Sequence, residues 1–346
     1  MKKVCMVIPN QMVKGGIAAV VNGYRGSQLE KDYKVTYVES YKDGSKIQKL
    51  LKGISGYFQF AKVILFYKPD IIHIHSSFGP SFYRKIPFIY MSAWSGIPII
   101  NHIHGSEFAK FYLNSSKRKQ RLVKKVWGKC SHFIVLSEQW KETFSIVIPK
   151  EKMSIVKNYS MVMPEIKREN NKTVLFLGLI NKMKGCYDIV DVIYEVSKKV
   201  PEVKMVMCGD GEIDEIKTRA QRKGILDKFE FPGWVRNEEK DKKLCEANIF
   251  FLPSYTEGMP MSILDAMGYG LPIVASEVGG IPKLVRNNGA MFKPGDIKGF
   301  AEELIELLED DRKLFEAGRE SINIVKAEYS LEVHIKQIED VYKKYL

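Results

Sequence analysis

Two carboxylates near residue 260 form the pattern in this sequence with the clearest chemical use. Glu257 precedes a glycine, and Asp265 follows eight positions later in a segment expected to be helical. Because eight residues are a little over two turns of an α-helix, both acids can face one ligand. One carboxylate can then hold sugar hydroxyls and the other the diol of a ribose. In the alternative, Glu257 caps the helix and Asp265 is a solvated residue on it.

Backbone N–H groups before this helix offer a second kind of contact. An apolar strand is expected to end at residue 252, a turn containing Gly258 follows, and Pro260 stands where the first helical turn is expected to begin. Free N–H groups at a helix N-terminus bind anions. The segment 257–265 is therefore expected to bind a phosphorylated ligand that also carries hydroxyl groups.

Short apolar runs alternate with amphipathic segments along the chain, as in doubly wound α/β proteins. The expected strands are 4–8, 34–38, 71–75, 97–101, 133–136 and 154–156, then 173–177, 204–208, 228–231, 249–252 and 272–275, and the helices of the second half are 187–199, 213–223, 240–247, 260–269 and 298–308. The polar, aperiodic end of 158–171 predicts a linker. Two such sheets imply a cleft, and ligands of open α/β sheets bind beyond the carboxyl ends of strands.

Charge is distributed unevenly between the halves. Residues 1–165 contain 26 Lys and Arg against 10 acidic residues, whereas residues 166–346 contain 28 against 31. The positive field of the first half favours an anionic partner, whether nucleic acid, an acidic membrane or a phosphorylated substrate.

Five cysteines without a C-x-x-C pair indicate neither a zinc site nor disulfides, and they fit a cytoplasmic setting. No apolar run approaches the roughly 18 residues that a membrane span needs.

The segment 251–281 closely resembles the donor-site motif of the group 1 (family 4) glycosyltransferases, which are retaining enzymes with the GT-B fold. In that family Glu-Gly-x-Pro is followed by an acid at the eighth position, usually Glu, where this chain has Asp265. The resemblance implies that the donor nucleotide sugar is bound by Glu257, Gly258, Met259, Pro260, Leu264 and Asp265.

Other loops resemble the same family in the same order along the chain. The loop Gly178 to Gly185 resembles the one whose two cations hold the donor diphosphate; Leu179 stands in place of the usual Arg, so this role falls to Lys184, with Lys182 supplying part of the missing charge. The resemblance also places Gly209 beside the donor. The loop Gly233, Trp234 and Val235 is implied to contact the base through its backbone.

In the first half, Gly15 and Gly16 follow the first expected strand and open a helix, so backbone can approach a phosphate closely there. The alternative is an ordinary flexible turn. His102 and His104 lie on one face of a strand, a spacing that can suggest a metal, but no third ligand is apparent in the sequence nearby. By resemblance, His104 reaches the donor sugar, and His73 and His75 face the acceptor.

The resemblance implies a two-domain GT-B protein of the type that builds bacterial surface polysaccharides. Residues 1–162, completed by a C-terminal helix at 332–346, form a Rossmann-like acceptor-side domain, and 172–331 form a Rossmann-like domain that binds the nucleotide sugar across a cleft. The expected donor is a UDP-sugar, the sugar a hexose or N-acetylhexosamine, and the expected catalytic residues are His104, Lys184 and Glu257. No cofactor or metal is expected, because no Asp-x-Asp metal motif occurs.

The basic first half suggests where the acceptor lies. Residues 116–129 place Leu122, Val123, Val126 and Trp127 on one helical face among cations, as in a helix at a membrane surface. In the alternative, this face packs on the sheet of its own domain. The aromatic-rich segment 78–90 adds apolar surface. We therefore expect a lipid-linked glycan as acceptor, an anionic membrane surface as partner, and a cytoplasmic location on the inner face of the plasma membrane.

Two other classes of function remain open. A nucleotide-sugar epimerase shares the two-domain plan and needs no acceptor. A basic nucleic-acid-binding protein also fits the charge, but the sequence contains no helix-turn-helix, zinc-finger or RNA-recognition signature, and no nucleic acid is expected as partner.

Overall fold

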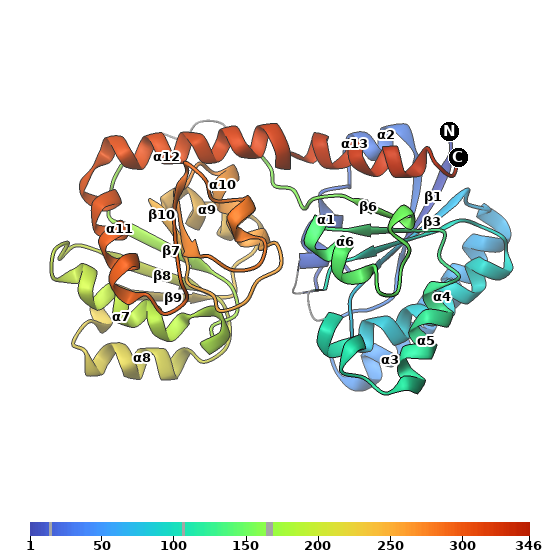
Figure 1. Ribbon diagram of the computed structural model, residues 1–346, viewed down its shortest axis with the longest axis horizontal. Coiled ribbons are helices and arrows are strands. Elements are labelled where there is room, and N and C mark those ends of the chain that lie inside the picture. The colour runs from blue at the N-terminus through green and yellow to red at the C-terminus, as the bar shows by residue number, and fades with distance from the viewer. Residues whose placement is uncertain (14–15, 106–107, 164–168) are drawn as a thin grey trace. The chain divides into compact units, whose positions relative to one another are not determined.

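The chain forms two compact units in a computed structural model that describes residues 1–13, 16–105, 108–163 and 169–346. Unit 1 comprises Met1–Asn158 and Leu331–Leu346, and unit 2 comprises Tyr159–Ser330. Each unit contains a six-stranded sheet with helices packed on it (Figure 1). The predicted pair of doubly wound parallel sheets is therefore confirmed.

Unit 1 has the strand order β2-β1-β3-β4-β5-β6, and every pairing is parallel. The strands are β1 (Lys3–Ile8), β2 (Lys34–Glu39), β3 (Ile71–Ser76), β4 (Ile99–Ile103), β5 (His132–Val135) and β6 (Met153–Ile155). The helices are α1 (Gly16–Asn22), α2 (Gln28–Asp32), α3 (Lys46–Lys62), α4 (Pro80–Trp94), α5 (Lys117–Trp127), α6 (Glu138–Phe144) and α13 (Leu331–Tyr342), with the π-helical η1 (Val63–Tyr67) and η2 (Ala109–Leu113) and the 3₁₀ turn η3 (Lys150–Lys152). The central strands β3 and β4 are buried throughout because helices cover both faces of a parallel sheet.

Unit 2 has the order β12-β11-β10-β7-β8-β9, again parallel. Its strands are β7 (Thr173–Leu177), β8 (Lys204–Cys208), β9 (Phe229–Gly233), β10 (Ile249–Leu252), β11 (Ile273–Ser276) and β12 (Gly289–Phe292). Its helices are α7 (Cys186–Ser197), α8 (Ile213–Arg222), α9 (Asn237–Glu246), α10 (Met261–Gly268), α11 (Ile297–Glu309) and α12 (Asp311–Ile324), with the π-helical η7 (Val325–Tyr329) and the 3₁₀ turns η4 (Lys182–Lys184), η5 (Leu226–Lys228) and η6 (Ile281–Lys283). One apolar core runs through the unit.

The C-terminal helix packs on unit 1, as expected. In Figure 1, α13 lies beside α2. Tyr342 on α13 is fully buried, and its hydroxyl lies 2.6 Å from Nδ1 of His73 on β3. Helix α13 therefore belongs to the same unit as β1 and β3.

Two differences from the predicted elements have local causes. The strand expected at 97–101 begins instead at Ile99, because Pro98 has no N–H to give to the ladder. The edge strand β12 was not predicted, since it is only four residues long and half-buried. Among the described helices, none is long and apolar enough to cross a membrane.

Candidate functional site

The loops after β7 and β10 bring together Lys184 and Glu257, two of the residues expected to be catalytic. These strands are parallel neighbours, so their carboxyl ends lie at the same edge of the sheet. Lys184 Nζ lies 2.6 Å from Glu257 Oε1, and Ser254 Oγ donates a hydrogen bond of 2.7 Å to the same oxygen. The Glu257 side chain is only 7% exposed. Its carboxylate is therefore fixed in one position beside a cation.

Close backbone contacts hold these loops against each other. Gly185 has φ of 70°, and a Cβ there would lie 2.0 Å from the carbonyl oxygen of Pro253. A Cβ on Gly279 would lie 1.9 Å from the carbonyl oxygen of Glu257. The Asn181 side chain accepts a 2.9 Å hydrogen bond from the N–H of Lys184. Only glycine fits at both contacts. These contacts fix how closely the backbone approaches the loops that carry Lys184 and Glu257.

Asp265 is partly buried and paired, with a side chain that is 20% exposed. Its Oδ2 lies 2.9 Å from Lys240 Nζ on α9, and Ser160 Oγ donates to its Oδ1 at 3.5 Å. Burial lowers the pKa of Lys240, but the attraction of the Asp265 carboxylate outweighs it, so that pKa is raised. The partner of Asp265 is thus a lysine that the sequence alone does not single out.

The alternative that Glu257 caps α10 is wrong. Pro260, the expected first helical residue, occupies the N-cap position, so α10 begins one residue later, at Met261, and no side chain caps this helix end. Glu257 bonds to Ser254 and Lys184 instead. Ser254, like Lys240, is a polar residue of the site that the sequence analysis missed.

The other predicted donor contacts of unit 2 divide into buried and open positions. The side chains of Val235, Met259 and Leu264 are buried in the unit 2 core, so only their backbone can meet a ligand. Gly258 and Trp234 are half-buried, Pro260 is buried, Gly233 is half-buried with φ of 80°, and Lys182 is exposed in η4. Gly209 packs its backbone against the carbonyl of Gly178.

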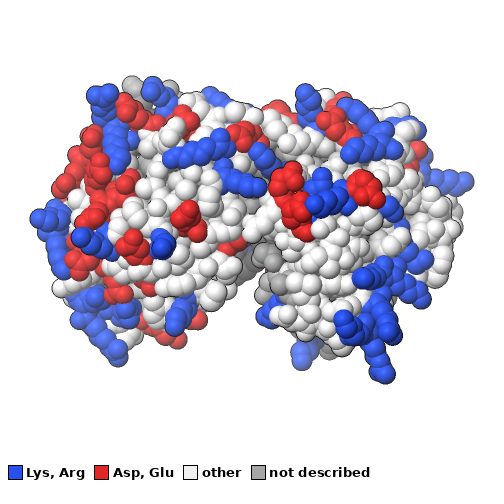
Figure 2. All heavy atoms as spheres, viewed as in Figure 1, with Lys and Arg blue, Asp and Glu red and all other residues white. Residues whose placement is uncertain are grey.

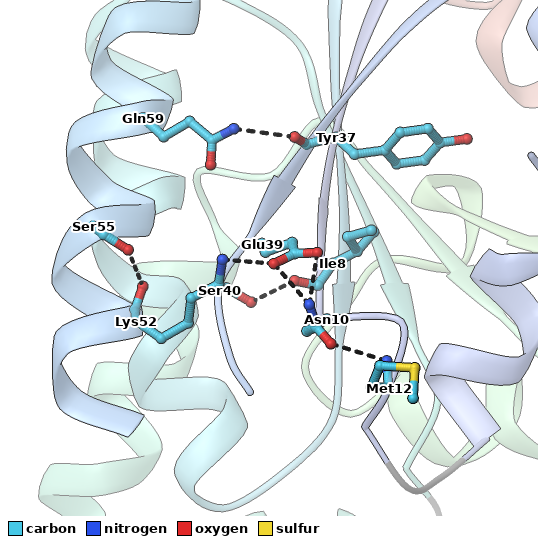
Figure 3. Close-up of polar contacts among 9 residues, drawn as sticks. All are labelled: Ile8, Asn10, Met12, Tyr37, Glu39, Ser40, Lys52, Ser55 and Gln59. Carbon is cyan, nitrogen blue, oxygen red and sulfur yellow. Dashed lines mark hydrogen bonds and ion pairs between the residues drawn. The ribbon is translucent and has the colours of Figure 1, made fainter. Parts of the chain in front are cut away.

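In unit 1, the loop after β1 is anchored at its start. Asn10 donates from Nδ2 to both carboxylate oxygens of Glu39 at 3.0 Å, and its Oδ1 accepts from the N–H of Met12 at 2.9 Å (Figure 3). Gly16 is the exposed first residue of α1. Gly15 lies outside the described residues.

His104 belongs to a stack of histidines at the ends of β3 and β4. Its Nε2 lies 2.9 Å from Nδ1 of His75, and its ring centre lies 4.1 Å from that of His102. Burial lowers the pKa of His104 to about 3 and that of His73 to about 3. These imidazoles are therefore neutral at physiological pH.

The sequence shows no third ligand beside His102, but the pairing of β3 with β4 brings two more histidines close to it. His73, His75 and His102 each offer a ring nitrogen, and these atoms lie within 4.8 Å of one another. Nε2 of His73, Nε2 of His75 and both ring nitrogens of His102 are buried without a hydrogen-bond partner. Neutral imidazoles are ligands for zinc and related metals, so the ring nitrogens of this cluster could hold such an ion. This histidine cluster cannot be recognised in the sequence, because its members come from two strands and meet only when β3 pairs with β4.

The basic helix α5 does not present its apolar face to a membrane. Val123, Val126 and Trp127 are buried in the unit 1 core, as the alternative interpretation of 116–129 predicted. Phe82 and Phe88 of the aromatic segment are also buried. These side chains belong to the apolar core of unit 1, so they are not available to contact a membrane.

Comparison with known proteins agrees with this architecture. A family model described as "Glycosyl transferases group 1" matches residues 171–310, and one described as "Glycosyltransferase Family 4" matches residues 12–159. The chain therefore belongs to the group 1 glycosyltransferases. A crystal structure of HepE from Anabaena in complex with UDP has a TM-score of 0.75 at 16% identity, covering 99% of this chain and 100% of that one. The fold is GT-B.

Two curated relatives illustrate the range of the family. The 2-deoxystreptamine N-acetyl-D-glucosaminyltransferase of Niallia circulans is 32% identical over 144 residues, which span 40% of this chain and 37% of that enzyme. The UDP-Gal:alpha-D-GlcNAc-diphosphoundecaprenol alpha-1,3-galactosyltransferase of Escherichia coli is 26% identical over 322 residues, 85% of this chain and 80% of that enzyme. Neither these relatives nor the family models point to an epimerase.

Proposed function

We propose that this chain is a retaining glycosyltransferase that transfers a hexose or N-acetylhexosamine from a UDP-sugar to a lipid-linked glycan during the synthesis of a cell-envelope polysaccharide. The observation that carries the proposal is the contact of Lys184, Ser254 and Glu257 at the ends of two neighbouring strands. The name of the Escherichia coli relative, which gives a UDP-sugar donor and a diphosphoundecaprenol acceptor, supports the choice of substrates.

The charges of this site suit the departure of a nucleoside diphosphate. When the bond between the anomeric carbon and the phosphate oxygen breaks, negative charge gathers on the diphosphate and positive charge on the sugar. A fixed cation at the leaving group lowers the barrier. Lys184 supplies that cation, with backbone N–H groups at the start of α10 as further donors, while Glu257 accepts hydrogen bonds from sugar hydroxyls.

In the proposed reaction the acceptor hydroxyl attacks the face of the sugar that the diphosphate leaves. The new bond joins the acceptor oxygen to the anomeric carbon, and the hydroxyl proton passes to a diphosphate oxygen, so that the anomeric configuration is retained. His104 contacts the sugar as a neutral imidazole, since burial holds its pKa at about 3. No step requires a metal ion.

Nucleotide binding tests the donor half of this proposal. A ligand that binds only the folded state raises the unfolding temperature by mass action. We expect UDP to raise it more than ADP, GDP or CDP does, and Lys184→Met to reduce the rise. A protein that no nucleoside diphosphate stabilises would contradict the proposal.

Analysis of the reaction product tests the retaining mechanism and the independence of the reaction from metal ions. NMR of the isolated product should show the same anomeric configuration as the donor, and transfer should continue in excess EDTA. An inverted product would overturn the retaining mechanism, and a loss of activity restored by added metal would overturn metal independence.

A further inference from the structure

Helix α3 carries its apolar stripe on the side that faces solvent. Ile47, Leu50, Leu51, Ile54 and Phe58 are spaced so that they share one helical face, the pattern that normally packs into a core. All five are exposed, by 42% to 71%. Single exposed apolar residues are common, but a continuous row of large ones marks a surface that binds something.

The opposite face of α3 is fixed to the sheet, so the stripe cannot turn inward. Gly56 lies so close to β2 that a Cβ there would be 2.6 Å from the carbonyl oxygen of Glu39. Lys52 Nζ lies 2.5 Å from Glu39 Oε2, and Gln59 Nε2 donates to the carbonyl of Tyr37 at 3.4 Å (Figure 3). In Figure 3, Lys52 and Gln59 reach from α3 toward the strands. The buried residues of α3 are Gly53, Gly56 and Phe60, and the five residues of the apolar stripe lie on the other side of the helix.

The apolar surface continues beyond α3 into η1. The N–H of Val63 still bonds to the carbonyl of Gln59, so the helical chain passes from α3 into η1 without a break. Leu65 is 64% exposed and Phe66 is 83% exposed. The α3–η1 surface is defined here by Ile47, Leu50, Leu51, Ile54, Phe58, Leu65 and Phe66.

The charge around this surface has one sign. Residues 44–137 contain 15 Lys and Arg but only two acidic residues, Asp70 and Glu107. Lys46 and Lys62 are exposed on α3 itself. On the face drawn in Figure 2, the part of unit 1 where Figure 1 places α3, α4 and α5 shows basic side chains and no acidic ones. An occupant of the surface must therefore be apolar and negatively charged at once.

We infer that the α3–η1 surface docks on an anionic lipid bilayer. A helix that lies in the membrane interface buries its apolar side chains between acyl chains while its lysines meet lipid phosphates, and α3 with η1 offers both. Docking here brings the enzyme to a lipid-linked acceptor, so the inference deepens the proposed function. It differs from the expectation for 116–129, where the apolar face is buried.

Vesicle co-sedimentation of the full chain tests this surface. The apolar variant carries Leu50→Gln, Leu51→Gln, Phe58→Gln and Phe66→Gln; the control variant carries Ile146→Gln and Phe315→Gln, which are 56% and 47% exposed but lie outside the surface. With phosphatidylglycerol vesicles, we expect the apolar variant to lose at least about tenfold in partitioning and the control variant to match the wild type. Replacing Lys46 and Lys62 by Gln should weaken binding and its dependence on salt.

Any of three sedimentation results would overturn the inference: wild-type protein that does not sediment with anionic vesicles, equal binding to vesicles of phosphatidylcholine alone, or an apolar variant that binds as well as wild type. If light scattering shows that the apolar variant turns a wild-type dimer into a monomer, a second copy covers the surface instead, and the inference also fails. The UDP-induced rise in unfolding temperature, which we expect to be unchanged in every variant, shows separately whether the donor site is sound.

Discussion

Replacing Glu257 by Gln removes one negative charge and leaves the shape of the side chain nearly unchanged. The amide oxygen can still accept from Ser254 and Lys184, but both hydrogen bonds lose the carboxylate's charge. A hydrogen bond to a charged group contributes about 1.5–3 kcal/mol. Lys184 is about one-third exposed, so solvent takes up part of its lost pairing, and we expect the free energy of unfolding to fall by only about 1 kcal/mol.

The effect on transfer should be larger than the effect on folding. Hydrogen bonds from sugar hydroxyls to the amide replace those to the carboxylate, and about 1.5–3 kcal/mol corresponds to a loss of roughly 10- to 100-fold in kcat/KM. The assay is UDP release from a UDP-sugar with acceptor present, alongside urea unfolding of the same preparation. Glu302→Gln is the matched control, because Glu302 is an exposed acid on α11.

Full activity of Glu257→Gln would refute the assignment of the site. A loss explained entirely by unfolded protein would refute the chemical role while leaving the structural one. Combining Glu257→Gln with Lys184→Met sharpens the result. If the two residues act as a unit, the double variant should lose less than the product of the two single losses.

Three further predictions follow from other contacts. Gly185→Ala should lower the free energy of unfolding by about 3 kcal/mol or more in urea titrations, because the new Cβ has a strained φ and meets the carbonyl of Pro253; unchanged stability would show that the loops can separate freely. Asp265→Asn should raise the KM for the donor by about tenfold, since it removes one charged hydrogen-bond acceptor, whereas Asp265→Glu should keep it near wild type; equal KM values for all three proteins would exclude Asp265 from the donor site. Acid should destabilise the fold: burial lowers the pKa of His73 to about 3 and that of His334 to about 4, so these side chains bind protons in the unfolded chain before they do in the folded one. Stability is then fully retained above pH 6.5 and falls from there toward pH 4, by about 1.4 kcal/mol per histidine at pH 5.5; equal urea midpoints at pH 7 and 5.5 would contradict this.

The strands were predictable because a parallel sheet covered on both sides buries its strands, so that most of their residues are apolar. This rule located β1, β7 and β10 within a residue. It failed for β12, which lies at the sheet edge and is half-exposed. A period of two or 3.6 residues indicates an element only where one of its faces is buried. A continuous apolar run indicates an element that is buried on all sides.

The partners in the site were less predictable than its members. Glu257 and Lys184 are 73 positions apart, and their contact depends on the pairing of β7 with β10. Nothing in the charged sequence of α9 distinguishes Lys240 from its neighbours until α9 and α10 are in place. The direction of an amphipathic helix is likewise a tertiary property: α5 buries its apolar face, whereas α3 exposes one.

The pairing of Lys184 with Glu257 also sets what the site rejects. A free phosphate ion that attracts Lys184 must compete with a carboxylate already at 2.6 Å, and it brings nothing to replace the lysine at Glu257. A sugar diphosphate supplies oxygens for Lys184 and hydroxyls for Glu257 together. In the proposed donor site, this ion pair would therefore favour a ligand that carries both groups over a free phosphate ion.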